Sequence, residues 1–261
     1  MSGPMPGGTL ASAAAGPGEK GLMAIHRGKD EGNDRRGASA PDPRWLARNG
    51  LVLDSAVHGE SLLPGIGADA AIATMRGLVA AGDLKPGDRL ITRDGGPREI
   101  VWVGRCDLTE AELARQPGLA PVRIAAGALG NGLPDRALTL SPHHRLLLRS
   151  EAAALYFSER EVLAPAGHLV GLPGISRVQD AAVSYVHVLC DRHELTLANS
   201  SWAETFQPGT AAMAGLGPAE RREIRALVPD LSEGEGPAVQ GAARRTLTRQ
   251  ETRLLLDWTR C

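Results

Sequence analysis

The chain has 261 residues and a mass of 27.4 kDa, and its 29 basic and 30 acidic residues leave a net charge of −1. This balance excludes a globally basic nucleic-acid binder, and no apolar run approaches the roughly 18 residues that a membrane-spanning helix needs. Glycine and proline number 32 and 18, a high share that still lies below the ~25–30% typical of low-complexity chains.

Residues 1–44 consist mainly of small and charged residues without a period of 2 or 3.6, and they predict a disordered tail. From residue 59 to residue 210, short apolar segments alternate with turn signals such as Asp94-Gly95, which is typical of an all-β fold. The predicted strands are 71–74, 89–92, 99–103, 122–124, 137–140, 145–149, 161–165, 182–189 and 194–198. No helical periodicity of useful length appears in this part of the chain.

Residues 211–261 predict a short helical extension. Pro218 stands in the first turn of an amphipathic segment, which is a favoured position for proline, and the helix is expected to end at Pro229. A second helix is predicted from Thr248 to Trp258. We expect both helices to pack on the β domain.

The cysteines argue against disulfide, zinc and redox chemistry. Cys106, Cys190 and Cys261 are odd in number and far apart, and no Cys-x-x-Cys occurs. No basic segment followed by an apolar one opens the chain, so no signal peptide is predicted and a cytoplasmic location is the default. We expect no cofactor and no bound metal.

Two histidine-bearing segments could carry chemistry. Ser141 precedes His144 by three residues on a turn that enters an apolar strand, a spacing that lets a hydroxyl and an imidazole act on one peptide amide. Ser-Pro is also an ordinary turn opening, so the spacing alone leaves a purely structural role open. Downstream, His187 and His193 would share one strand face, and two ligands do not complete a tetrahedral metal site.

Nearby charged residues suggest how the second segment is organised. Asp191, Arg192 and Glu194 flank His193, and we expect a local charge network there to orient its imidazole. Arg145 is expected to pair with either Glu204 or Asp191, and the sequence does not decide between these two partners.

Long motifs then give a family resemblance. Residues 123–148, 161–175 and 184–209 read RIAAGALGNGLPDRALTLSPHHRLLL, EVLAPAGHLVGLPGI and SYVHVLCDRHELTLANSSWAETFQPG. Together with the segment 71–104, they resemble the Hint (Hedgehog/intein) domain, in particular its free-standing bacterial group, over residues 59–210. The resemblance implies an all-β, horseshoe-like fold built from two β subdomains related by a pseudo-twofold axis.

The resemblance also implies a chemistry. Active members attack their own preceding carbonyl with a first-residue Cys or Ser, and a Ser/Thr-x-x-His pair activates the scissile amide. By motif, this pair falls on Ser141 and His144, and the later histidine of the pattern falls on His193. We therefore expect these three side chains to cluster in space.

The chain departs from the pattern of active members at both ends. By the resemblance, counting back from residues 72–74 places the first residue of the domain at Gly65, which has no nucleophilic side chain. The nearest hydroxyl belongs to Ser61, four residues earlier. Splicing members end in His-Asn, where this chain has Ala203-Glu204. We interpret the protein as a non-splicing Hint domain whose partner is unknown. The alternative is an autoprocessing domain that cleaves its own chain, with no separate substrate, by means of Ser61 or water.

Overall fold

The computed structural model describes residues 51–53, 64–179, 181–227 and 242–258. The predicted tail 1–44 and the alternative nucleophile Ser61 lie outside these ranges. All the described residues belong to one unit, residues 41–261. Within the described part of the chain, no helix combines the length and apolarity that crossing a membrane requires.

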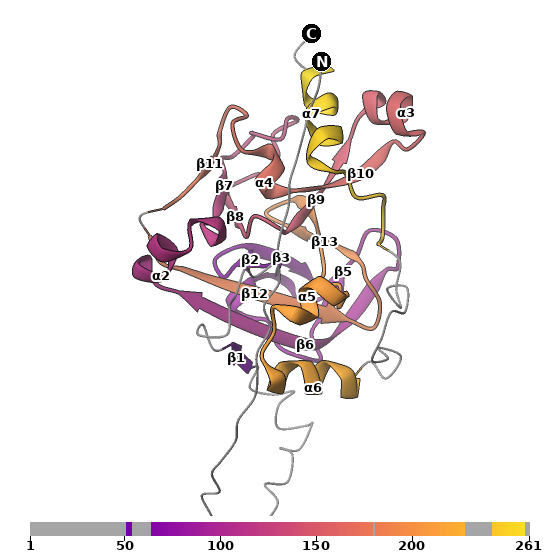
Figure 1. The fold of residues 1–261 in the computed structure, drawn as a ribbon. Coiled ribbons are helices and arrows are strands. Elements are labelled where there is room, and N and C mark those ends of the chain that lie inside the picture. The colour runs from indigo at the N-terminus through magenta and orange to yellow at the C-terminus, as the bar shows by residue number, and fades with distance from the viewer. Residues whose placement is uncertain (1–50, 54–63, 180, 228–241, 259–261) are drawn as a thin grey trace, which may run out of the picture. The chain divides into compact units, whose positions relative to one another are not determined.

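The described residues form a largely antiparallel sheet, as the alternating pattern predicts (Figure 1). Its main path runs β10-β9-β14-β13-β3-β5-β6-β12-β2-β8-β7-β11, while β1 pairs with β6 and β4 pairs with β3. The strands are β1 (Leu51–Leu53), β2 (Ile66–Gly67), β3 (Ala71–Thr74), β4 (Gly77–Ala80), β5 (Arg89–Ile91), β6 (Pro97–Leu108), β7 (Val122–Ile124), β8 (Leu138–Leu140), β9 (Arg145–Arg149), β10 (Glu161–Pro165), β11 (Ile175–Arg177), β12 (Val183–Cys190), β13 (Leu195–Ala198) and β14 (Ser201–Glu204).

Turn chemistry sets the register of the hairpins. The predicted Asp94-Gly95 turn joins β5 to β6, where Ile91 pairs with Pro97. Asn199 and Ser200, with φ of 45° and 63°, join β13 to β14, and positive φ at both central positions is the geometry that a two-residue hairpin prefers.

Asn199 also links this hairpin to two other segments. Its Oδ1 accepts from the Ala71 N–H at 2.7 Å, and its Nδ2 donates to the Ala137 carbonyl at 2.9 Å. Asn199 is buried, so these bonds satisfy groups that water does not reach. The asparagine therefore has a structural role as well as a turn-forming one.

Apolar side chains from the sheet make the core. The largest cluster includes Ile72, Leu90, Ile124, Leu140 and Leu146, all nearly inaccessible to solvent. A second cluster surrounds Trp102, whose ring centroid lies 5.8 Å from that of Phe206. Trp102 is 2% exposed and belongs to the core.

Helices occur in more places than the periodicity predicts. The expected C-terminal pair is present as α6 (Pro218–Leu227) and α7 (Arg249–Trp258), preceded by α5 (Thr210–Ala214). Before residue 209, where no helical periodicity of useful length appears in the sequence, three short helices lie between the strands: α2 (Glu110–Arg115), α3 (Glu151–Phe157) and α4 (Ala166–Leu169). They are only four to seven residues long, too short for a 3.6-residue period to show.

Candidate functional site

The candidate site forms where β2 lies between β8 and β12. Ile66 pairs with Leu140 on one side and with Val186 on the other. Gly65 directly precedes Ile66, so the antiparallel register continues to Ser141 on the β8 side and to His187 on the β12 side. Three segments that are far apart in sequence thus meet at Gly65.

Ser141 holds the backbone of Gly65 through two hydrogen bonds. The Gly65 N–H donates to Ser141 Oγ at 2.8 Å, and the Ser141 N–H donates to the Gly65 carbonyl at 2.9 Å. Ser141 is buried, with only 4% of its surface exposed. The hydroxyl predicted from the Ser-x-x-His pattern therefore contacts the amide at the position that counting along the chain assigns to the first residue.

His187 holds the other polar atom of the same peptide bond. Its Nδ1 lies 2.6 Å from the carbonyl oxygen of Pro64. A carbonyl can only accept, so Nδ1 carries the proton and donates. The Pro64–Gly65 peptide bond is thus held at its carbonyl by His187 and at its N–H by Ser141, and we call this arrangement the peptide clamp.

There is no room at Gly65 for a side chain. A Cβ built on this glycine would lie 2.7 Å from the Cβ of Tyr185 and 3.1 Å from Cε1 of His187. The Tyr185 Cβ is attached directly to the backbone of β12 and cannot swing aside, and the Tyr185 hydroxyl donates to the Leu119 carbonyl at 3.1 Å. The space that a nucleophilic side chain would need is filled.

His144 is buried beside the clamp and stays neutral. Burial, followed by the Arg145 charge and the neighbouring imidazoles of His187 and His193, lowers the pKa of His144 to about 4 against the opposing effect of Glu204. Among the residues that the structure describes, neither ring nitrogen has a hydrogen-bond partner. A neutral imidazole can accept or donate a proton. Among the described residues, however, no polar group is hydrogen-bonded to His144 to receive or supply one.

Glu204 joins His193 to Arg145. Its Oε2 lies 3.2 Å from His193 Nε2 and also pairs with the Arg145 guanidinium, while its Oε1 accepts from the Arg145 N–H at 2.9 Å. Burial alone would raise the pKa of Glu204, but the hydrogen bond from His193 and the Arg145 charge outweigh it and lower the pKa. Glu204 is thus a buried carboxylate, and of the two partners proposed for Arg145 it is the one found.

His193 is oriented by groups other than its sequence neighbours. The Ala243 N–H donates to His193 Nδ1 at 3.0 Å, so Nδ1 is the acceptor and Nε2 donates to Glu204. The expected local network is wrong in this respect, because Asp191 and Glu194 lie against Arg98 instead.

The structure brings Ser141, His144 and His193 into one neighbourhood. Ser141 and His144 share a turn, with the His144 N–H donating to the Ser141 carbonyl at 3.1 Å, and His193 is close enough to affect the His144 pKa. The proposed nucleophile Ser61 lies outside the described residues. Within them, no group of three His, Cys, Asp or Glu side chains could hold a metal ion.

Sequence reasoning missed the role of His187. It considered this residue only as a metal ligand, whereas the structure places it on the Pro64 carbonyl. The available signal was a polar residue inside the apolar run Tyr185-Val186-His187-Val188-Leu189, because a buried imidazole needs a partner.

Comparison with known proteins gives the family of the chain. The sequence profile of the Hint domain matches residues 64–210, more than half of the chain. The chain belongs to the Hint domain family. The match begins at Pro64, the residue whose carbonyl the clamp holds.

Solved structures of inteins are similar at low sequence identity. The MchDnaB-1 intein is 14% identical with a TM-score of 0.35, and the match covers 54% of this chain and 98% of the intein. The gp41-1 intein is 12% identical with a TM-score of 0.31, covering 54% and 97%. The Msm DnaB1 intein splicing domain bound with zinc is 18% identical with a TM-score of 0.33, covering 54% and 98%. Among curated proteins, none matches the chain significantly.

Proposed function

We propose that this protein is a Hint domain that neither splices nor cleaves itself, and that it acts as a binding or assembly module in an intact chain. The observation that carries the proposal is the distance of 2.7 Å between a Cβ built on Gly65 and the Cβ of Tyr185. Acyl transfer needs a nucleophile on that carbon. Gly65 offers none, and β12 occupies its place.

The state of His144 supports the same conclusion. Expelling the Gly65 nitrogen as an amine requires a proton donor, and His144 is the nearest candidate by motif. With its pKa lowered to about 4 by burial, only about one molecule in a thousand carries that proton at pH 7. Pro64, Gly65 and Ile66 are also buried, so water has little access to the peptide bond.

A second candidate function is slow self-cleavage by Ser61 or by water. It is favoured by the peptide clamp itself, because His187 donates to the Pro64 carbonyl and would stabilise negative charge developing on that oxygen. Ser141 would meanwhile hold the departing amide. In this candidate, His187 and Ser141 activate the Pro64–Gly65 peptide bond, and only the nucleophile comes from elsewhere, from Ser61 or from water.

Intact mass separates the two functions. We expect the purified full chain to keep its mass of 27.4 kDa after incubation with dithiothreitol or hydroxylamine. A new N-terminus near residue 60, at Ser61 or at Gly65, would overturn the proposal and support self-cleavage. The variant Ser61→Ala would then distinguish a serine nucleophile, whose loss stops cleavage, from water.

A restored thiol tests the steric argument. We expect Gly65→Cys to remain uncleaved in thiol, and Gly65→Cys combined with Tyr185→Gly to cleave slowly before residue 65, because only the double variant removes the 2.7 Å contact with the Tyr185 Cβ, while neutral His144 still limits the rate. Gly118→Cys is the matched control, since a Cβ there meets no atom within 4 Å. Circular dichroism verifies that each variant is folded. Cleavage of Gly65→Cys alone would refute the steric argument.

A further inference from the structure

The segment 242–248 lies beyond the family match, yet it extends the β sheet. Strand β10 ends the strand order, and an edge strand presents unpaired backbone groups. The Leu163 N–H donates to the Arg245 carbonyl and the Leu247 N–H donates to the Leu163 carbonyl, both at 2.8 Å. Leu163 thus forms a parallel bridge with Thr246, which is the geometry of strand addition to an edge.

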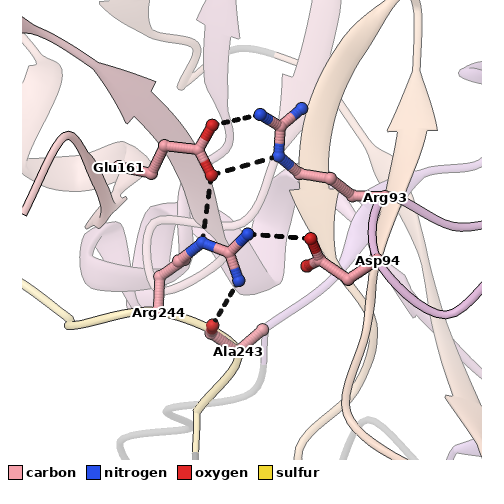
Figure 2. Close-up of polar contacts among 5 residues, drawn as sticks. All are labelled: Arg93, Asp94, Glu161, Ala243 and Arg244. Carbon is pink, nitrogen blue, oxygen red and sulfur yellow. Dashed lines mark hydrogen bonds and ion pairs between the residues drawn. The ribbon is translucent and has the colours of Figure 1, made fainter.

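Arg244 is the main polar anchor of this segment. Figure 2 shows its guanidinium between two carboxylates, with Nη2 2.9 Å from Asp94 Oδ1 and Nε 3.0 Å from Glu161 Oε2. Asp94 lies in the β5–β6 turn and Glu161 begins β10, so the two acids belong to different hairpins. Arg93 binds the same Glu161 carboxylate from the other side. Charge-assisted bonds of this kind are stronger than neutral ones.

The same segment reaches the candidate site. The residue before Arg244 is Ala243, whose N–H donates to His193 Nδ1 at 3.0 Å. This bond makes Nδ1 the acceptor and leaves the ring proton on Nε2, facing Glu204. Occupancy of the β10 edge therefore covers Nδ1 of His193 and adds a hydrogen bond to the tautomer that the Glu204 carboxylate already requires.

Apolar and hydroxyl contacts complete the attachment. Leu247 and Leu255, each about 1% exposed, pack in a small cluster with Ala152, Ala153 and Val162. Thr246 Oγ1 accepts from Arg145 Nη1 at 2.8 Å. The contacts fall along the run Ala243-Arg244-Arg245-Thr246-Leu247, in which the Arg245 guanidinium lies 5.0 Å from the Phe157 ring centroid.

We propose that the β10 edge, together with the Asp94–Glu161 pair and His193, is a binding site for an extended arginine-containing peptide, occupied here by the chain's own residues 243–247. The inference goes beyond the proposed function and does not depend on it. Because this segment is covalently joined to the domain, its effective concentration at the edge is high. A free peptide would therefore compete only after the tether is cut.

The test begins with the full chain and cuts it once. A protease site is introduced within residues 228–241, the purified protein is cleaved, and a fluorescent synthetic peptide of residues 242–261 is added. We expect the cleaved piece to co-elute with the domain and to exchange with the labelled peptide. A peptide with Arg244→Ala should bind at least tenfold more weakly, and a peptide with Arg253→Ala, which changes an exposed arginine of α7, should bind normally.

Three outcomes would overturn the proposal: release of the cleaved piece without rebinding, equal binding of the Arg244→Ala peptide, or unfolding of the domain on cleavage. A measurement on the uncut chain checks the link to the site. In Arg244→Ala, but not in Arg253→Ala, we expect at least tenfold faster hydrogen exchange at the Ala243 and Leu247 amides and a changed 15N shift of His193 Nδ1. Unchanged exchange and shift would also refute it.

Discussion

The burial of His144 predicts a defined dependence of stability on pH. Its pKa is 6.5 in an exposed setting and about 4 in the folded protein, chiefly because of burial. Between these values the unfolded chain binds a proton that the native chain does not. The free energy of unfolding therefore falls as the pH drops below 6.5, and the contribution of His144 is fully lost below pH 4.

The size of this effect follows from the shift. The full change is about 3 kcal/mol, since one pKa unit is worth about 1.4 kcal/mol, and the part that falls between pH 7 and pH 5 is about 2 kcal/mol. We expect that in His144→Gln the free energy of unfolding falls about 2 kcal/mol less between pH 7 and pH 5 than in the wild type. The assay is urea unfolding of the wild type and the variant at several pH values, and only the difference in slope is interpreted, because the substitution also changes the baseline stability.

In the range from pH 7 to pH 5 the imidazoles titrate, and burial lowers the pKa of His143 and His168 as well, so the His144 contribution is taken from the difference between the wild type and His144→Gln. Glu204, whose pKa is lowered, contributes the same sign of change but only as the pH falls through the carboxyl range below 4.5. The control is His143→Gln, because His143 is adjacent and more exposed; its pKa is also lowered, by partial burial and by the Arg177 charge, but less than that of the fully buried His144, so this variant should change the slope less. Equal slopes for the wild type and His144→Gln would refute the reasoning about His144.

Two further variants test buried polar contacts. Glu204→Gln leaves His193 and Arg145 without their shared carboxylate, and breaking a buried pair costs about 3–5 kcal/mol. We expect a lower melting temperature by roughly 6–20 °C, whereas Glu99→Gln on the exposed surface of β6 should change little. Asn199→Ala loses two buried hydrogen bonds and should cost about 2–4 kcal/mol, measured by urea unfolding. The control Asn131→Ala shares the positive φ but is exposed, so equal costs would assign the effect to backbone strain alone.

The strands were predictable because their signals are local. Short apolar segments and flanking turn residues mark 71–74, 122–124, 145–149 and 161–165, and the structure has strands at these same residues. The short helices were not predictable from periodicity, although caps were present in the sequence. Thr109 and Glu112 form a capping box before α2, and Ser150 caps α3.

The residues of the candidate site also differ in whether a local sequence pattern could identify them. The Ser-x-x-His motif identified Ser141 and His144 because both lie on one turn, and counting along the chain placed the first residue at Gly65. The role of His187 depends on the pairing of β12 with β2, across 123 residues of sequence. Strand register over such a separation is decided by packing of the whole sheet, and a local pattern does not contain it.

The sequence by itself determined the family, the strand-rich domain and the absence of a nucleophile at Gly65, since each is a property of residue type and order. Only the tertiary structure decided that Tyr185 fills the space beside Gly65 and that Ala243 binds His193. Both are contacts between segments that chain folding brings within a few ångströms. As a consequence, no side chain fits at Gly65, and the Nδ1 of His193 is covered by Ala243. Both results depend on shape and hydrogen-bond geometry that exist only once the strands have paired.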